Sequence, residues 1–189
     1  MESHLSALRA DYERQAGRSV ALPIAGAVVW AVVGLAALVL PEWPATLALL
    51  FGTGLMFPLA MLLARPLGEK LIDNSSPLAR LMAQAVLMVN LLWALHFTVI
   101  VLDPQYVPLT LGIGLGLHWI VFSWILGHPV GMIHAILRTL LVTLAWWLFP
   151  ETRLATVSLA VVIAYAMSIA VLATRKQNVA MSARGTRQA

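Results

Sequence analysis

Apolar residues occur along this chain in six long, nearly uninterrupted runs, separated by short breaks rich in proline and polar residues. The runs are Val20 to Leu40, Ala45 to Ala64, Leu81 to Leu102, Leu109 to Leu126, Met132 to Phe149 and Leu154 to Thr174. Each run is close to the roughly 20 residues with which a helix crosses about 30 Å of hydrocarbon. Because backbone polar groups in hydrocarbon must be satisfied within the segment, we expect six transmembrane helices.

Prolines and capping residues separate these runs. Ser76-Pro77, before the third run, is typical of an N-cap followed by the first residue of a helix. The other breaks contain Pro41-Glu42-Trp43-Pro44, Asp103-Pro104, Gly127-His128-Pro129 and Pro150-Glu151. The pattern predicts an all-α integral membrane fold of three hairpins with short outer turns, in which residues 20–174 form the six-helix domain.

The two ends of the chain are more polar. Residues 1–19 carry apolar side chains at helical spacing, at Leu5, Leu8, Tyr12 and Ala16. This segment is either an interfacial helix lying along the cytoplasmic face of the membrane or a solvated helix that folds back onto the loops. Residues 175–189 are predicted to be a basic cytoplasmic tail.

Composition agrees with a membrane protein. Hydrophobic residues make up 61% of the 189 residues, charged residues make up 11%, and the mean hydropathy is +0.89. A soluble domain carries about a quarter charged residues, so we expect lipid to surround this bundle. The absence of cysteine excludes disulfides, thiolate metal sites and cysteine nucleophiles.

The positions of the basic residues predict the orientation. Taken alone, a net charge of +4 and a pI near 10.1 suggest a protein that binds nucleic acid, but the positions of the basic residues indicate otherwise. With six spans, Arg153 lies on one side, Arg138 lies within a span, and the other ten of the 12 lysines and arginines lie on the side of the two termini. The positive-inside rule then places both termini in the cytoplasm. We expect a multi-pass protein of a bacterial cytoplasmic membrane, with no nucleic-acid partner.

Polar side chains within the runs are candidates for function, because each is costly in hydrocarbon unless it has a partner. They are Gln84, Asn90, His96, His118, His134, Arg138 and Ser168. His96 and His118 lie within roughly 5 Å of each other in depth on consecutive helices. Asn90 and His96 are about 120° apart around their helix. His118 can therefore pair with either of them, and all three meet only around a cavity.

The histidines allow two interpretations. His96 and His118 together can relay protons near neutral pH, or ligate haem or a transition metal. Otherwise each histidine bridges neighbouring helices through a hydrogen bond. We expect no cofactor and no metal, with a metal at His96 and His118 as the weaker alternative.

His134 and Arg138 are four residues apart and share one face of the fifth helix. Arg138 lies roughly 9 Å from the cytoplasmic face, from which its side chain can reach the headgroups. Alternatively it points inward, beside His134, and holds an anion or carbonyl groups. No acidic residue lies within any run, so an inward Arg138 needs a backbone, amide, water or anionic partner.

Tryptophan, glycine and proline add further candidates. Trp93 and Trp119 lie within runs, either as walls of an aromatic cavity or as packing residues. Gly52, Gly54 and Pro58 weaken the second helix and predict a kink or a hinge there.

The leading functional interpretation is a small-molecule or ion transporter or channel, or a ligand-binding bundle, with a polar and aromatic site at mid-membrane. Its candidate residues are Asn90, Trp93, His96, His118, Trp119, His134 and Arg138. The alternatives are a non-catalytic accessory or assembly protein and, third, a haem- or metal-binding redox protein. Because HExxH, GxSxG and a phosphate-binding glycine loop do not occur, we expect no enzyme. The expected partners are the bilayer, a small ligand and a second copy of the chain.

Three segments carry a resemblance: GAVVW (Gly26 to Trp30), FGTGLMFPLA (Phe51 to Ala60) and NSSPLARL (Asn74 to Leu81). In these segments the chain resembles an uncharacterised bacterial family of short multi-span membrane proteins, classed as a domain of unknown function. The resemblance implies a helical membrane fold over most of the chain and carries no activity or site.

Overall fold

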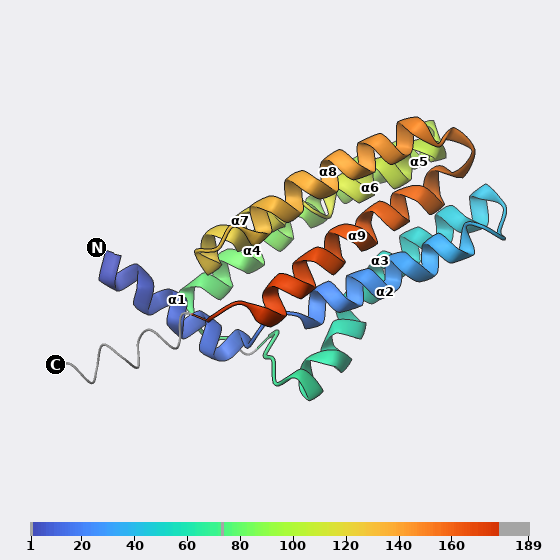
Figure 1. Cartoon of the computed structure of the whole chain (residues 1–189). Helices are drawn as coiled ribbons and strands as arrows, with labels where there is room; N and C mark the ends of the chain where they lie inside the picture. The colour runs from blue at the N-terminus through green and yellow to red at the C-terminus, as the bar shows by residue number, and fades with distance from the viewer. Residues whose placement is uncertain (1, 73, 178–189) are drawn as a thin grey trace.

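The computed structural model of the chain describes residues 2–72 and 74–177, which form nine α-helices and no strand (Figure 1). The helices are α1 (Glu2–Ala16), α2 (Ala21–Ala36), α3 (Glu42–Leu67), α4 (Pro77–Leu91), α5 (Trp93–Leu102), α6 (Val107–Gly114), α7 (His118–Leu126), α8 (Val130–Leu148) and α9 (Arg153–Thr174). Short 3-10 turns at Pro104–Tyr106 and Pro150–Thr152 precede α6 and α9. The all-α prediction is confirmed, and the predicted basic tail lies outside the described residues from residue 178 on.

Five segments of the described chain are long and apolar enough to cross a membrane: Glu42–Leu67, Pro77–Leu102, Pro104–Leu126, Val130–Leu148 and Pro150–Thr174. A sixth arises if α1 and α2, which meet at 57°, count as one broken segment. The prediction of a helix from Val20 to Leu40 is too long, because α2 ends at Ala36. Pro41 accounts for part of the early end of α2, since a proline disfavours helical conformation in the residue before it.

The helices lie side by side in an elongated bundle (Figure 1). The α2–α3 and α8–α9 hairpins turn at one end of the bundle, and α1 lies at the other end. Helix α9 lies between α8 and α2 and packs extensively against both. Its buried side chains, together mainly with those of α2, α6, α7 and α8, form the apolar core.

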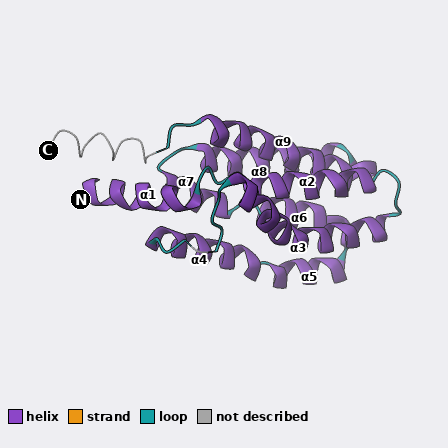
Figure 2. Cartoon of the chain, turned by 90° about the horizontal axis from the view of Figure 1, so that it is seen from below, coloured by secondary structure: helices purple, strands orange, loops and turns teal. Residues whose placement is uncertain are grey.

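Two of the predicted continuous helices are interrupted. The third run is divided at Leu92 into α4 and α5, which remain in line (Figure 2). The fourth run is divided between Gly114 and His118, where the backbone N–H of Gly116 donates to Ile113 O at 2.9 Å and that of Leu117 donates to Gly114 O at 3.2 Å. Glycine destabilises a helix interior, so the sequence GIGLG accounts for the second break.

The second predicted helix is continuous. Helix α3 runs as one helix through Gly52, Gly54 and Pro58. Its last turns point away from the bundle axis in Figure 1. A hinge motion at these three residues stays a prediction.

Helix α1 folds back onto the bundle end. Tyr12 and Ala16 belong to the apolar core, and Glu13 forms a nearly buried ion pair with Arg175 at the end of α9. One turn before Glu13 on the same face of α1, Arg9 donates to the carbonyl of Trp124 at 2.7 Å and lies 5.6 Å from its ring centroid. These contacts favour the helix that folds back over the one that lies freely along an interface.

Glu69 caps the N-terminus of α2 from a distant part of the chain. Gly68 ends α3 in the left-handed region with a φ of +68°, and the next residue, Glu69, accepts hydrogen bonds from the backbone N–H groups of Val20 (2.7 Å) and Ala21 (3.0 Å). The first N–H groups of a helix lack partners within the helix and attract negative charge. Burial raises the pKa of Glu69, against the opposing effect of these backbone hydrogen bonds.

This raised pKa predicts a pH-dependent stability. Burial in the folded protein favours the protonated carboxyl of Glu69. The stabilising contribution of this carboxyl is therefore complete when the pH lies below its pKa in the unfolded chain, near 4.5. The contribution is lost as the pH rises through the pKa of Glu69 in the folded protein. We expect the melting temperature of the wild type to fall relative to that of Glu69→Gln as pH rises above 4.5, measured by thermal unfolding in detergent. Glu151→Gln, which changes an exposed carboxylate, is the matched control. A difference between wild type and Glu69→Gln that stays constant with pH would contradict the assignment.

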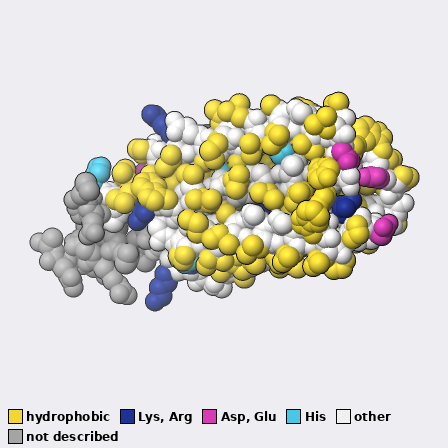
Figure 3. Space-filling model, turned by 90° about the horizontal axis from the view of Figure 1, so that it is seen from above, with side chains coloured by type: hydrophobic (Ala, Val, Ile, Leu, Met, Phe, Trp, Pro, Cys, Tyr) yellow, Lys and Arg dark blue, Asp and Glu magenta, His cyan; other side chains and the backbone are white. Residues whose placement is uncertain are grey.

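The surface is largely apolar along its length. Large hydrophobic side chains are exposed on several helices, among them Phe51 and Leu62 of α3, Val101 of α5 and Trp147 of α8. Figure 3 shows hydrophobic side chains over most of the described surface, with acidic ones gathered mainly at the end that carries the α2–α3 and α8–α9 turns. This apolar surface is compatible with a membrane protein.

Candidate functional site

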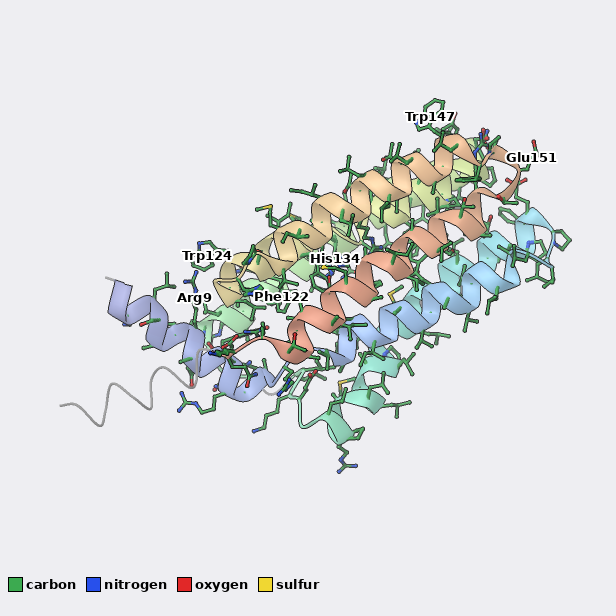
Figure 4. The ribbon with its side chains drawn as sticks, in the orientation of Figure 1. Arg9, Phe122, Trp124, His134, Trp147 and Glu151 are labelled. Atoms are coloured by element: carbon green, nitrogen blue, oxygen red, sulfur yellow. The ribbon has the colours of Figure 1, made fainter. Side chains whose placement is uncertain are left out.

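Two of the predicted residues, His134 and Arg138, are fully buried in the centre of the bundle. Figure 4 shows His134 midway along the bundle, on the side of α8 that faces α9. Arg138 is 0% exposed, so its side chain does not reach the surface of the bundle. Of the two predicted orientations for Arg138, the structure has the inward one. Six aromatic or basic residues from α2, α7, α8 and α9 make up what we call the Arg138 cluster: Trp30, His118, Trp119, His134, Arg138 and Tyr165.

The break between α6 and α7 positions the guanidinium of Arg138. In a regular helix the N–H of Gly116 would donate to Gly112 O, but here it donates to Ile113 O. Arg138 Nε donates to Gly112 O at 2.5 Å. The broken helix therefore supplies a backbone carbonyl that holds one side of the guanidinium.

The other side of the guanidinium has no polar partner among the described residues. Arg138 Nη1 and Nη2 are buried without a hydrogen bond. The guanidinium carbon lies 5.2 Å from the ring centroid of Tyr165 and 5.6 Å from that of Trp30. Aromatic faces attract a cation by about 2 kcal/mol when it is desolvated. The two terminal nitrogens are therefore buried donors without an acceptor among the described residues.

His134 is fixed from two sides. Its Nδ1 lies 2.8 Å from Ser168 Oγ and 3.2 Å from the carbonyl oxygen of Ala164. Because that carbonyl only accepts hydrogen bonds, Nδ1 carries the proton. The ring stacks on Trp119 with centroids 3.8 Å apart and planes at 14°. Its Nε2 is buried without a partner among the described residues.

Glycines allow this cluster to pack closely. A Cβ on Gly116 would lie 2.9 Å from Arg138 Cδ, and one on Gly26 would lie 2.6 Å from the ring of Tyr165. In α8, a Cβ on Gly131 would lie only 2.1 Å from the carbonyl oxygen of Trp119. These distances are shorter than real Cβ contacts, so each glycine is required for the observed approach of its neighbours.

The remaining predicted residues lie elsewhere or contribute less. Asn90 is exposed, and its side-chain amide donates to Val86 O in its own helix at 2.9 Å. His96 is buried with Nδ1 3.2 Å from Thr110 Oγ1, and it also contacts the ring of Trp93 edge-on.

His118 lies at the start of α7, after the break between α6 and α7, and is next to Trp119 in the chain. Their ring centroids are 6.3 Å apart, and His118 Nδ1 is buried without a hydrogen bond among the described residues. His96 and His118 thus make separate contacts. The structure assigns His96 to the α5–α6 interface and His118 to the Arg138 cluster.

Sequence reasoning missed three parts of the candidate site. Tyr165 was not singled out, although it lies three residues before Ser168 and therefore on the same face of α9. The carbonyl of Gly112 had no sequence signal beyond the glycine-rich segment GIGLG in which it lies. Trp30, which stood out in the sequence only as the last residue of the GAVVW segment, packs on Arg138.

A separate pocket of about 440 Å³, which Arg138 does not line, opens at the end of the bundle that carries the α2–α3 and α8–α9 turns. Its lining includes the carboxylates of Glu42, Asp103 and Glu151 and the guanidinium of Arg153. Arg153 is already bound, since it contacts the side chain of Gln105 and lies 4.5 Å from the ring centroid of Trp146. This end of the molecule is therefore acidic.

Comparison with known families gives one match. The model of a family of unknown function, DUF7010, matches residues 5–175 of the 189-residue chain. The chain belongs to the DUF7010 family. The predicted resemblance to an uncharacterised family is thereby confirmed. The matched range of this DUF7010 member contains the whole Arg138 cluster and both partners of the Glu13–Arg175 ion pair. No curated protein and no solved structure matches the chain.

Proposed function

We propose that this DUF7010 member is an integral protein of a bacterial cytoplasmic membrane that binds a small ligand at the Arg138 cluster, as a transporter, a channel or a ligand-binding bundle. In this proposal the chain crosses the bilayer six times, with both termini in the cytoplasm. The apolar surface and the five to six long apolar segments support the membrane setting.

The observation that carries the ligand proposal is the buried, partly unpartnered guanidinium of Arg138. Removing a charge from water costs several kcal/mol even after relaxation, and one carbonyl with two aromatic faces offsets only part of this. Ionisable residues held in the interior of a membrane bundle usually serve ligand or ion pathways. A ligand that pairs with Nη1 and Nη2 offsets the rest of the cost of burying the charge of Arg138.

The broken helix beside Arg138 supports the same proposal. Discontinuous helices near the bilayer midplane commonly form substrate sites in transporters, because their free backbone groups bind ligands or ligand-binding side chains. Here the break frees the Gly112 carbonyl, and that carbonyl orients Arg138. The backbone break between α6 and α7 and the side chain of Arg138 thus form parts of the same candidate site.

A panel of small solutes tests the ligand proposal. We expect at least one solute class to raise the melting temperature of the purified wild type and of Arg80→Met, and to leave Arg138→Met unchanged. Arg80 is the matched control because it is an exposed arginine on α4 and the substitution is the same. If every solute that stabilises the wild type also stabilises Arg138→Met, the cluster is not the binding site.

The proposed topology is testable because the chain contains no cysteine. Single cysteines at Glu42 and Glu151 in the outer turns should react with a membrane-impermeant maleimide in intact cells. Single cysteines at Ser75 and Arg80 should react only after the membrane is permeabilised. All four of these side chains are exposed in the structure, so reactivity reports the side of the membrane. Equal labelling of the two pairs in intact cells would contradict the six-span topology.

A non-catalytic accessory or assembly protein is the second candidate. The exposed apolar faces of α3, α4 and α5 favour it, since they are available to a membrane partner as well as to lipid. In that case Arg138 only bridges helices. Its replacement by methionine would then destabilise the bundle and change no solute response.

A further inference from the structure

We propose that the ligand of the Arg138 cluster is a small monovalent anion, of the size of a halide or nitrate, bound by the two terminal nitrogens of Arg138. This inference rests on the proposed function, which places a ligand at this cluster, and adds the chemical class of that ligand.

The charge of the ligand follows from the distribution of acidic residues. An arginine side chain stays protonated in proteins, so Arg138 keeps a full positive charge in the bundle interior. All eight aspartates and glutamates of the chain lie at or beyond the ends of the apolar runs. Since no carboxylate of residues 2–72 and 74–177 pairs with Arg138, the counter-charge comes from the ligand, and one positive charge matches one negative charge.

The unpartnered groups of Arg138 and Trp30 favour a hydrogen-bond acceptor as the ligand. Arg138 Nε is already bound to Gly112 O, which leaves the Nη1 and Nη2 donors. Trp30, whose ring faces the guanidinium, has a buried indole N–H without a partner among the described residues. Indole and guanidinium nitrogens only donate hydrogen bonds. An anion accepts from both, whereas a cation or a hydrogen-bond donor accepts from neither.

The packing around the guanidinium sets the size of the ligand. Even a methyl group on Gly116 would lie 2.9 Å from Arg138 Cδ, and a methyl group on Gly26 would press against the ring of Tyr165. The aromatic rings of Trp30 and Tyr165 occupy the sides of the guanidinium. Because the surroundings of the guanidinium are tightly packed, a compact, weakly hydrated anion requires less rearrangement of these side chains than a bulky organic acid does.

The charges at the two ends of the bundle favour approach from one end. Exposed basic residues Arg18, Lys70 and Lys176 lie near the end that carries α1. Carboxylates line the pocket at the opposite end. Charged surfaces raise the local concentration of ions of opposite sign, so an anion reaches the cluster from the basic end.

The test uses the purified full-length chain in a neutral detergent at constant ionic strength. Sodium gluconate, whose anion is too large for the site, is replaced stepwise by sodium chloride, bromide or nitrate while the melting temperature is recorded. We expect a saturable rise for the wild type and for Arg80→Met, and none for Arg138→Met. Arg138→Lys keeps the charge but loses the two-pronged donor edge, so its half-saturating anion concentration should be at least tenfold higher.

A second measurement covers the case in which Arg138→Met does not fold. Iodide should quench the fluorescence of the buried wild-type tryptophans saturably, and chloride should compete with it. Linear quenching without competition would overturn the proposal.

A third experiment adds phosphatidylglycerol or phosphatidylcholine to the purified chain at constant salt. If the anionic lipid alone stabilises the protein saturably, the ligand is a lipid phosphate and not a free anion.

Two further outcomes separate this inference from the proposed function. If a neutral or zwitterionic solute stabilises the wild type through Arg138 while chloride, bromide and nitrate do not, the binding site stands and the anion class is wrong. If no solute and no anion acts through Arg138, both proposals fail.

Discussion

Replacement of Arg138 by methionine is expected to abolish ligand binding while leaving the bundle folded and its free energy of unfolding unchanged within about 1 kcal/mol or raised. The substitution removes a buried charge, whose desolvation costs several kcal/mol. It also removes the hydrogen bond to Gly112 O and the contacts with Trp30 and Tyr165. An unsatisfied buried carbonyl costs about 1–3 kcal/mol, and the lost aromatic contacts add about 2 kcal/mol, so these losses roughly offset the gain.

This expectation separates the two candidate functions. If Arg138 serves only to bridge helices, its hydrogen bond to Gly112 O and its contacts with Trp30 and Tyr165 outweigh the desolvation of its charge, so its removal should lower the free energy of unfolding by about 3 kcal/mol or more. Unfolding of the wild type, Arg138→Met and Arg80→Met in mixed micelles, followed by circular dichroism, measures the difference. A strongly destabilised Arg138→Met beside an unchanged Arg80→Met would favour the accessory protein.

Replacement of Gly131 by alanine is expected to have the largest effect on folding. The added Cβ would lie 2.1 Å from the carbonyl oxygen of Trp119 and 2.8 Å from the backbone nitrogen of Ser123. Both atoms belong to the backbone of α7, so no side-chain rotation relieves the clash. Helices α7 and α8 must separate, which also disrupts the stacking of His134 on Trp119. We expect a loss of about 3 kcal/mol, at the upper end of the usual cost of overpacking.

Gly54→Ala is the matched control for this variant. A Cβ on Gly54 meets nothing within 4 Å, and the residue lies in the interior of helix α3. Alanine there should be neutral or stabilising by up to about 1 kcal/mol. Equal melting temperatures for Gly131→Ala and Gly54→Ala would show that α7 and α8 do not approach as closely as the structure has them.

The helices of this fold were predictable from the sequence, because apolar runs of the right length end at prolines and capping residues such as Ser76-Pro77. The break between Gly114 and His118 was not predicted, although the glycines that weaken the helix are visible in the sequence. A glycine can be accommodated within a helix, and only the packing of Arg138 and the neighbouring helices decides that the helix opens here.

The composition of the candidate site was predictable only in part. The sequence placed His134 and Arg138 on one face of a helix but left open whether that face points inward. Depth along the bundle suggested that His96 and His118 meet, yet His96 contacts Thr110 instead. The position of a residue along the bundle axis follows from counting residues, whereas the rotation of each helix about its own axis depends on packing. For the same reason the exposed position of Asn90 could not be derived from the sequence.

The most direct test of the central claim is the position of a bromide ion in crystals of the full chain grown or soaked in sodium bromide. The anomalous signal of bromide locates it independently of the protein density. We predict a peak within hydrogen-bonding distance of Arg138 Nη1 and Nη2, and no such peak in Arg138→Met crystals under the same conditions. Bromide peaks confined to the surface, with the interior of the wild-type bundle unoccupied, would contradict an anion site at Arg138.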